Sequence, residues 1–297
     1  MKRLMMNLIK VKITPHSSFV TFPKGDTIFG HFAYHTFNQD KSIFENYITD
    51  EPKIIFSDIL PADYLYKPTL PLNAFGVKES NKKEFRKKAW IKTKNLQDGA
   101  LHLARACSFF KTEIRVRNSI NRVSFSTDDS GVFAPYSIEE ISFLSQPVIY
   151  ILYDGKYFDE ATILERLNLI GKVGFGKKGS IGKGHFRAIL DKSFIDFRNK
   201  KSEYYMTLSP TLLHKSKDLI KDKEVYYNTF NRFGKYHSST TPFKKPLLMA
   251  DSGAVVKLKE PREWIGGGIE NSIGENQSLV QGYSIVVPFE YKGVKDV

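Results

Sequence analysis

The sequence contains little cysteine and no long apolar stretch, and each absence excludes a class of protein. Cys107 is the only cysteine among the 297 residues, so neither an internal disulfide nor a paired-cysteine zinc site can form. No run of 18 or more apolar residues occurs, which argues against a membrane-spanning helix. Lys10 and Lys12 interrupt the apolar N-terminal segment, so we expect a strand over residues 3–14 and no signal peptide. These features predict a cytoplasmic protein.

Acidic residues are too few to balance the basic ones. The chain has 45 lysines and arginines and 32 acidic residues, which gives a formal net charge of +13. Hydrophobic residues make up 41% and charged residues 26%, which are values typical of globular proteins. This excess of positive charge predicts a polyanionic partner. The alternatives are a basic surface that maintains solubility, or one that an acidic protein covers.

The order of the expected elements predicts an α+β fold. An amphipathic helix is expected over 159–169, after a turn at Asp154-Gly155. The segments expected to form strands after residue 14 are 53–60, 147–153, 185–190, 203–209, 223–230, 253–258 and 280–289. We predict two ferredoxin-like (RRM-like) domains with antiparallel sheets and insertions.

The predicted domain boundary lies near Gly155. Residues 1–155 are expected to form the first domain, with a basic insertion at about 74–112. Residues 156–297 are expected to form a second, degraded copy that carries a glycine-rich loop at 171–184.

Three local features give more specific expectations. Asp26 is expected to be the N-cap of a helix whose apolar face includes Phe29, Phe32 and Phe37. Gly30 inside that helix suggests close packing against a neighbouring backbone. The three glycines at 266–268 predict a flexible loop before the last strand.

Residues 171–184, GKVGFGKKGSIGKG, combine six glycines with four lysines and no acidic residue. Successive N–H groups in a glycine-rich loop can form an anion-binding nest. Lysines attract phosphates, and the Ser180 hydroxyl can donate a hydrogen bond. We therefore predict that this segment, the glycine loop, binds a sugar-phosphate chain. The residues expected at this site are Gly174, Phe175, Gly176, Lys177, Lys178, Gly179, Ser180, Gly182, Lys183, Gly184 and His185.

Two common phosphate-binding motifs do not fit the glycine loop. Residues 174–179 match GxGxxG, but that motif follows a strand and opens a helix, whereas here a helix is expected first. The Walker A motif fails because Gly184 follows Lys183 where serine or threonine is required. A flexible solvated loop is the remaining alternative, and the conformational entropy of six glycines opposes it.

Two arginines precede the glycine loop in a segment, 114–125, that is expected to be extended or one arm of a hairpin. Arg115 and Arg117 are two positions apart, so in a strand they share a face. Arginine can bind phosphate through two donors or stack on an exposed base. The alternative is that they pair with acids such as Glu113 or Asp128.

Two further features remain open from the sequence. The stretch 78–94 has eight lysines and arginines against two glutamates, which fits either an RNA-facing insertion or a solvated helix. Phe175 and Phe186, beside the glycine loop, are candidates for base stacking.

Several segments resemble motifs of the RAMP superfamily of CRISPR proteins. The pattern GxG, five residues, GxG at 174–184 resembles the glycine-rich loop of that superfamily. Other segments resemble the Csm-complex subunit that holds the 5′ handle of crRNA, and they occur in order along the chain. They are DTIFGHFAYHTF (26–37), IIFSDILPADYLYKPTLPL (54–72), RVRNSINR (115–122), DSGAVVKL (251–258) and GYSIVVPF (282–289).

This resemblance implies a non-catalytic RNA-binding subunit of a type III-A effector complex in antiviral defence. It implies that the glycine loop binds the repeat-derived 5′ handle, with Arg117, Asn118 and Arg122 near the crRNA. The implied partners are crRNA, the large polymerase-nuclease subunit and the adjacent backbone RAMP subunit. No cofactor, metal ion, small-molecule substrate or membrane is expected.

Two other functions remain as alternatives. A metal-independent RAMP endonuclease that processes the crRNA precursor shares the glycine consensus, and His16 could be its general acid or base. In such enzymes the loop lies near the C-terminus, whereas 113 residues follow Gly184 here. A protein scaffold with an incidental basic face is the third hypothesis. His31 and His35 have the spacing of zinc ligands, but Phe32 occupies the place of the HExxH glutamate.

Overall fold

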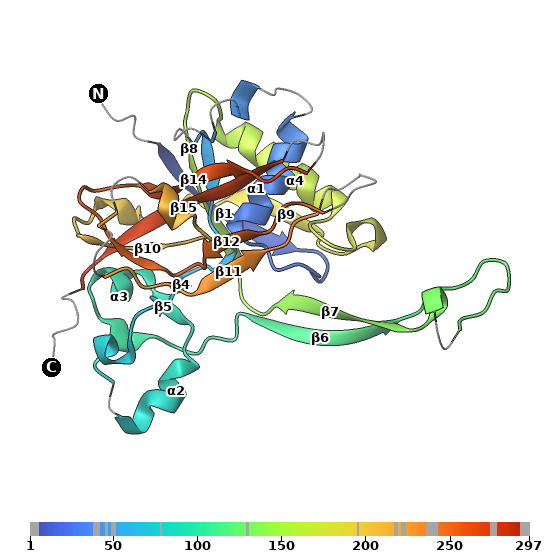
Figure 1. Cartoon of the computed structure of the whole chain (residues 1–297), viewed down its shortest axis with the longest axis horizontal. Coiled ribbons are helices and arrows are strands. Elements are labelled where there is room, and N and C mark those ends of the chain that lie inside the picture. The colour runs from blue at the N-terminus through green and yellow to red at the C-terminus, as the bar shows by residue number, and fades with distance from the viewer. Residues whose placement is uncertain are drawn as a thin grey trace.

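The computed structural model combines helices with antiparallel sheets, and one long arm projects from its body (Figure 1). It describes residues 6–37, 42–44, 47–48, 52–77, 79–128, 131–194, 196–216, 219–220, 224–235, 243–273 and 278–291. Residues 3–5 of the first expected strand and Lys78 of the basic stretch lie outside these ranges. No helix in the described ranges is long and apolar enough to cross a membrane.

The first sheet has the strand order β2-β8-β1-β9, and all of its pairings are antiparallel. Along β1, Ile9, Val11 and Ile13 are buried at alternate positions, as expected for a strand with one face in the core. β8 is buried along its whole length because its sequence is continuously apolar. The strands are β1 (Asn7–Pro15), β2 (Ile54–Phe56), β8 (Pro147–Tyr153), β9 (Phe186–Leu190) and the short β3 (Leu60–Pro61), which pairs with β8.

Two helices pack beside this sheet and against each other. α1 (Gly25–Phe37) packs against α4 (Glu160–Val173), β2 and β15, whereas α4 packs against β9. Asp159 caps α4, because its carboxylate accepts a hydrogen bond from the Thr162 N–H at 2.7 Å. The helix expected over 159–169 is therefore confirmed and continues to Val173, directly before the glycine loop.

The second sheet has the strand order β13-β10-β15-β14. Its strands are β10 (Tyr204–Thr207), β13 (Val255–Lys257), β14 (Trp264–Glu270) and β15 (Leu279–Phe289), and a separate ribbon pairs β11 (Thr229–Arg232) with β12 (Leu247–Ala250). Gln281 of β15 donates to the Phe56 carbonyl at 2.7 Å and accepts from the Phe56 N–H at 2.9 Å. One hydrophobic core extends from β1 and β8 to β15, so the two sheets are packed as one body.

The first sheet contains residues from both sides of the sequence boundary expected near Gly155. β9 follows that point in the chain and pairs with β1 from Val11↔Leu190 to Pro15↔Phe186. The glycine loop therefore connects α4, a helix that packs against the first sheet, to β9, which is a strand of that sheet.

The flexible loop expected at 266–268 is wrong, because these glycines lie inside β14 and pair with β15. They allow close packing: a Cβ on Gly268 would lie 2.5 Å from the Tyr47 carbonyl oxygen. The glycines are thus required by a crowded strand.

Two expectations about the first helix are also wrong. Asp26 lies inside the first turn of α1, where its buried carboxylate accepts a hydrogen bond from Arg232 Nη2 at 2.6 Å, so it is not the N-cap. A Cβ on Gly30 would meet nothing within 4 Å, so no neighbouring backbone requires glycine there.

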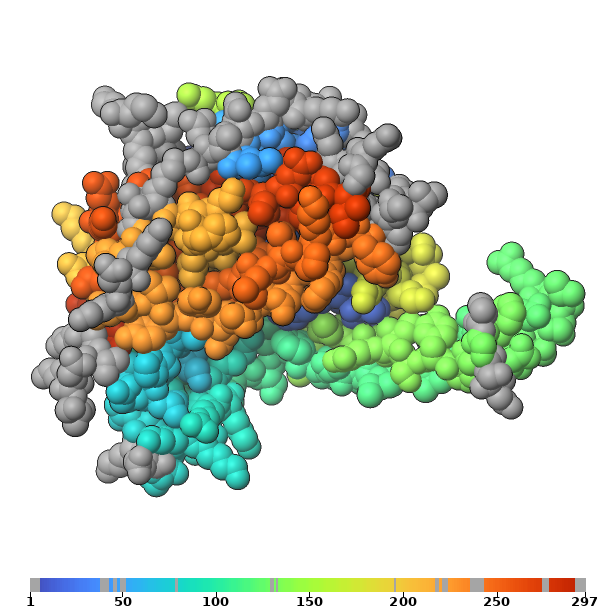
Figure 2. All heavy atoms as spheres, in the orientation of Figure 1, coloured from blue at the N-terminus to red at the C-terminus, as the bar shows by residue number. Residues whose placement is uncertain are grey.

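The chain between β3 and β8 forms a separate lobe and the projecting arm (Figure 2). The lobe contains β4 (Tyr64–Tyr66), α2 (Lys82–Arg86), β5 (Trp90–Lys92) and α3 (Thr93–Gln97). The arm is the hairpin of β6 (Phe110–Arg117) and β7 (Tyr136–Phe143), so the extended arm predicted for residues 114–125 is confirmed for 114–117, whereas residues 118–125 lie beyond the end of the strand. Short 3₁₀ turns lie at Ser42–Phe44, Leu72–Phe75, Glu79–Asn81, Leu101–Leu103, Gly131–Phe133, Gly179–Ile181, Phe197–Asn199 and Leu213–Lys215.

Candidate nucleic-acid interface

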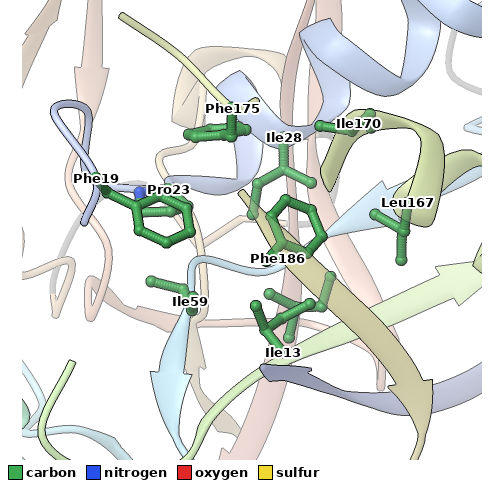
Figure 3. A pocket seen from close by; sticks show the side chains of 10 residues that line it. Ile13, Phe19, Pro23, Ile28, Ile59, Leu167, Ile170, Phe175 and Phe186 are labelled. Carbon is green, nitrogen blue, oxygen red and sulfur yellow. The ribbon is translucent and has the colours of Figure 1, made fainter. Parts of the chain in front are cut away.

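The glycine loop is anchored to the core by an aromatic side chain. Phe175 is only 2% exposed, and its ring centroid lies 4.7 Å from that of His31 on α1. Figure 3 shows Phe175, Phe186 and Phe19 around an apolar cavity of about 20 Å³. The expectation that Phe175 or Phe186 stacks on a base is wrong for this structure, because both rings are buried in the core.

Most backbone N–H groups of the glycine loop already have partners in the protein. Gly176 N–H donates to His31 Nε2 at 3.2 Å, and Lys177 N–H donates to Thr21 Oγ1 at 3.0 Å. Between residues 174 and 184, the donors with such partners are those of Gly174, Phe175, Gly176, Lys177, Ile181, Gly182, Lys183 and Gly184. The N–H groups of residues 178–180 form no hydrogen bond within the described part of the chain. The predicted nest therefore narrows to three successive amides at the tip of the loop.

Two of the predicted lysines are available at this tip. Lys177 and Lys178 are exposed, and neither forms an ion pair with a described residue. Lys178 Nζ lies 4.8 Å from the ring centroid of Tyr136 on β7, so the tip contacts the arm. Ser180 is also exposed and can donate its hydroxyl.

Lys183 has a different role from the other two lysines. Its side chain is 14% exposed, and Nζ lies 2.7 Å from Glu140 Oε2 on β7. Glu140 also accepts hydrogen bonds from the Ser18 hydroxyl at 2.7 Å and from Arg117 Nη2 at 3.1 Å. The hydrogen bond from Lys183 lowers the pKa of Glu140 to about 2, and those from Ser18 and Arg117 act in the same direction. This carboxylate therefore joins the arm to the glycine loop.

The arginines predicted on the arm do not all lie near the loop. Arg117 reaches it through Glu140, whereas Arg115 Nη2 pairs with Glu113 Oε2 at 2.9 Å on an exposed strand. Asn118 and Arg122 follow β6 and are exposed. Neither contacts the loop through a hydrogen bond or an ion pair within the described ranges. The alternative that Arg115 and Arg117 pair with acids is thus realised for both, Arg115 with Glu113 and Arg117 with Glu140.

The sequence did not identify the residues that hold the loop and the arm together. They are Ser18, Thr21, His31, Tyr136 and Glu140. One signal was present for Glu140. It lies two positions after the buried Ile138, on the face of β7 where a strand with one buried face would have an apolar residue.

The next feature is the set of histidines that the structure describes. The described residues contain no group of three His, Cys, Asp or Glu side chains that could hold a metal ion. His31 accepts a hydrogen bond from the loop and packs on Phe175. His16 is exposed, and its N–H donates to the His185 carbonyl at 2.8 Å, which places it at the base of the loop.

Comparison with known proteins adds one sequence relative. No family model matches the chain. The CRISPR system Cms protein Csm4 of Thermococcus onnurineus (strain NA1) is 28% identical over 227 residues. The match covers 70% of this chain and 76% of that protein.

Solved structures with similar folds cover nearly the whole chain. A chain in the crystal structure of a Csm1-Csm4 cassette in complex with AMPPNP has a TM-score of 0.59 at 21% identity, covering 96% of this chain and 99% of its own. A chain in the Csm3-Csm4 subcomplex of the type III-A CRISPR-Cas interference complex has a TM-score of 0.60 at 19% identity, covering 95% and 99%. These similarities establish the α+β fold with antiparallel sheets.

Proposed function

We propose that this homologue of Csm4 is a non-catalytic subunit of a type III-A CRISPR effector complex that binds the 5′ repeat-derived handle of crRNA. The observation that carries the proposal is the exposed tip of the glycine loop. There, three successive amides without partners in the described chain stand beside Lys177 and Lys178. A phosphate can accept hydrogen bonds from such amides while the ammonium groups stabilise its charge.

The structure supports different roles for the predicted site residues. We assign direct RNA contact to Lys177, Lys178, Gly179 and Ser180, which form the exposed tip. Phe175, Lys183 and the glycines at the loop base hold this tip in place. Arg117 lies next to it, and we propose that Arg115, Asn118 and Arg122 contact RNA farther along the arm.

The proposed partners follow from the relatives. Csm4 occurs with Csm1 in a cassette and with Csm3 in a subcomplex of the type III-A interference complex. We extend both associations to this chain, as docking to the large polymerase-nuclease subunit and to the adjacent backbone RAMP subunit. Because crRNA is a cytoplasmic RNA of prokaryotes, this role places the chain in the cytoplasm.

We also propose that the chain has two RRM-like domains of the RAMP type. The element order β1-α1-β2-β8-α4-β9, with the strand order β9-β1-β8-β2, supports a ferredoxin-like first domain. On this basis the first domain extends to about residue 190, with residues 62–146 inserted between β3 and β8. The second sheet, within residues 196–291, would be the degraded copy.

A gel-shift titration in EDTA tests the proposed function. The full chain is titrated with an RNA of the host repeat's handle sequence and with a scrambled RNA of the same composition. We expect tighter binding of the handle RNA, which stays intact. Equal affinity for both RNAs would favour the scaffold alternative. A shortened RNA product that the wild type forms and the His16→Ala variant does not form would favour the endonuclease.

Charge reversal at the tip tests the assignment of the site. Lys177→Glu with Lys178→Glu should weaken handle binding about 100-fold, because two hydrogen bonds to a charged group together contribute about 3 kcal/mol. The matched control, Lys156→Glu with Lys192→Glu, reverses two exposed lysines elsewhere and should have a much smaller effect. Equal affinities of the two variants would contradict the loop assignment.

A further inference from the structure

The lobe that carries the arm holds nearly half of the net charge of the protein. Residues 82–105 lie within the insertion expected at about 74–112, and the name basic insertion refers to them from here on. They contain eight lysines and arginines and two acidic residues, a net charge of +6. The basic residues are Lys82, Lys83, Arg86, Lys87, Lys88, Lys92, Lys94 and Arg105. The whole chain of 297 residues has a net charge of +13. The charge is thus strongly concentrated in this short segment.

Ion pairs do not neutralise most of this charge. Lys83, Arg86, Lys87 and Lys88 form no ion pair with any residue in the described ranges. Some lysines of the main body are paired instead: Lys24 pairs with Asp251, for example. The basic insertion therefore presents a positive electrostatic potential at its surface.

A groove of about 310 Å³ is lined by one of these cations, Lys88. Asn81, Phe85, Lys88 and His102 contribute to its lining, together with one carboxylate, Glu84. Its volume is at the lower end of the range for small-ligand sites, which is enough for one nucleotide. Phe85 is buried, so Asn81, Lys88 and His102 supply the polar groups that suit a base and its phosphate.

Two lysines approach the same aromatic ring in this region. Lys88 Nζ lies 5.2 Å and Lys67 Nζ 5.0 Å from the ring centroid of Phe85. Burial, and next the charge of Lys88, lower the pKa of Lys67. An anion bound near Lys88 would relieve this repulsion, so the arrangement favours a negatively charged ligand.

The surface is unlike a protein-docking face. The core of a protein–protein interface is apolar, but Leu103, at 41% exposure, is the only large exposed hydrophobic residue described within 82–105. The arm offers the opposite chemistry, with Val123 at 91% and Phe125 at 86% exposure. Of the two kinds of polyanion, an acidic protein or RNA, the basic insertion fits RNA better.

We infer that the basic insertion is a second RNA-binding surface, which holds the sugar-phosphate backbone of a single-stranded segment other than the one at the glycine loop. The inference relies on the proposed function for the identity of the polyanion. It adds a site with a different binding mode, in which diffuse lysine contacts surround one seated nucleotide.

Binding measured against salt concentration tests this inference on the full chain. Two RNAs are compared: the handle alone, and the handle extended by unrelated single-stranded sequence. The test variant combines Lys83→Gln, Arg86→Gln, Lys87→Gln and Lys88→Gln. We expect about tenfold weaker binding of the extended RNA and a slope of log K against log salt that is shallower by up to about 3, because each lost phosphate contact removes about 0.7. Binding of the handle alone should be unchanged.

The matched control removes four charges from other exposed positions, with glutamine at Lys156, Lys192, Lys201 and Lys259. If the test variant and this control bind the extended RNA with the same affinity and slope, the inference is wrong and an acidic protein becomes the better candidate. Lys83→Arg with Lys87→Arg and Lys88→Arg should retain binding, because it preserves the charge. An equal loss of affinity for the handle and for the extended RNA would show that the basic insertion is not a site separate from the glycine loop.

Two further results separate this inference from the proposed function. Lys177→Glu with Lys178→Glu should abolish handle preference but leave the salt-dependent contribution of the basic insertion in place. Photocrosslinking of wild-type protein to the extended RNA gives a readout that needs no variant. We expect crosslinked peptides within residues 82–105, and crosslinks confined to the glycine loop and the arm would contradict the inference.

Discussion

The glycine loop and the basic insertion are both rich in lysine, but the protein holds them in different ways. In the loop, Phe175 is buried and Lys183 is paired with Glu140. His31 and Thr21 accept hydrogen bonds from backbone N–H groups of the loop. In the basic insertion, Lys83, Arg86 and Lys87 are exposed and form no ion pair within the described chain. The first region is a shaped site with few free donors, whereas the second is a charged surface around a groove.

This difference separates specificity for one RNA from general affinity for RNA, two properties that net charge alone does not distinguish. A shaped site fixes the direction of its donors, so it can distinguish one RNA conformation from another. A set of mobile lysines attracts any phosphate chain and depends strongly on salt. We therefore expect specificity from the glycine loop and sequence-independent affinity from the basic insertion.

The largest effect should follow from removing the anchor of the loop. Phe175→Ala should lower the free energy of unfolding by about 3–5 kcal/mol, because it leaves a cavity in a close-packed apolar core. Denaturant unfolding of the purified chain measures this change. Phe125→Ala is the control, because that ring is exposed on the arm and its loss should be almost neutral. Equal effects of the two substitutions would contradict the anchoring role.

A smaller effect is expected where the loop meets the arm. Glu140→Gln should destabilise the protein by about 2–3 kcal/mol, because Lys183 and Arg117 would lose a buried charged partner. Glu113→Gln removes a carboxylate from an exposed pair that solvent screens, so its effect on stability should be much smaller. If the two variants unfold at the same denaturant concentration, Glu140 does not join the two elements.

The same contact predicts a pH dependence. The pKa of Glu140 in the folded protein is lowered to about 2, so its contribution to stability is complete above about pH 4.5. The contribution should be lost as pH falls from about 4.5 towards 2. Unfolding curves of the wild type and Glu140→Gln should therefore converge over this window. A constant difference between them down to pH 2 would contradict the assignment.

The smallest effect concerns the backbone at the tip of the loop. Gly182 has φ of +86° and nothing within 4 Å of a built Cβ, so a side chain there meets conformational strain without a clash. Gly182→Val should cost about 1–2 kcal/mol and weaken handle binding about tenfold. Gly182→Asn should be nearly neutral, because asparagine tolerates the left-handed region. The affinity of both variants for the handle RNA provides the test. Equal losses of affinity would show that the added side chain, and not the backbone conformation, weakens binding.

The sequence predicted the elements whose signals are local. Asp159 marked the start of α4, the glycine pattern marked the loop after it, and the apolar run at 147–153 marked β8. Local signals failed where glycine had a tertiary role. The glycines at 266–268 have the composition of a loop, but they lie in a strand paired with β15, where the close approach of Tyr47 leaves no room for a Cβ on Gly268.

The candidate site was predicted only in part, for a related reason. The exposed lysines of the loop could be recognised because they are contiguous in the sequence. The contact of Glu140 with Lys183 and Ser18 joins residues 43 and 122 positions apart. No periodicity or spacing in the sequence indicates such a pairing. Lys183 was therefore predicted to bind phosphate, although its amine is paired with Glu140.

The hydrogen bonds that fix the glycine loop also have a kinetic consequence. Eight of its amides are bonded before any ligand arrives, so little chain ordering remains for the binding step. Association can then proceed at the rate of a productive encounter, without a slow rearrangement. The lifetime of the bound RNA, set by its dissociation rate, would then determine how often the protein exchanges one guide for another.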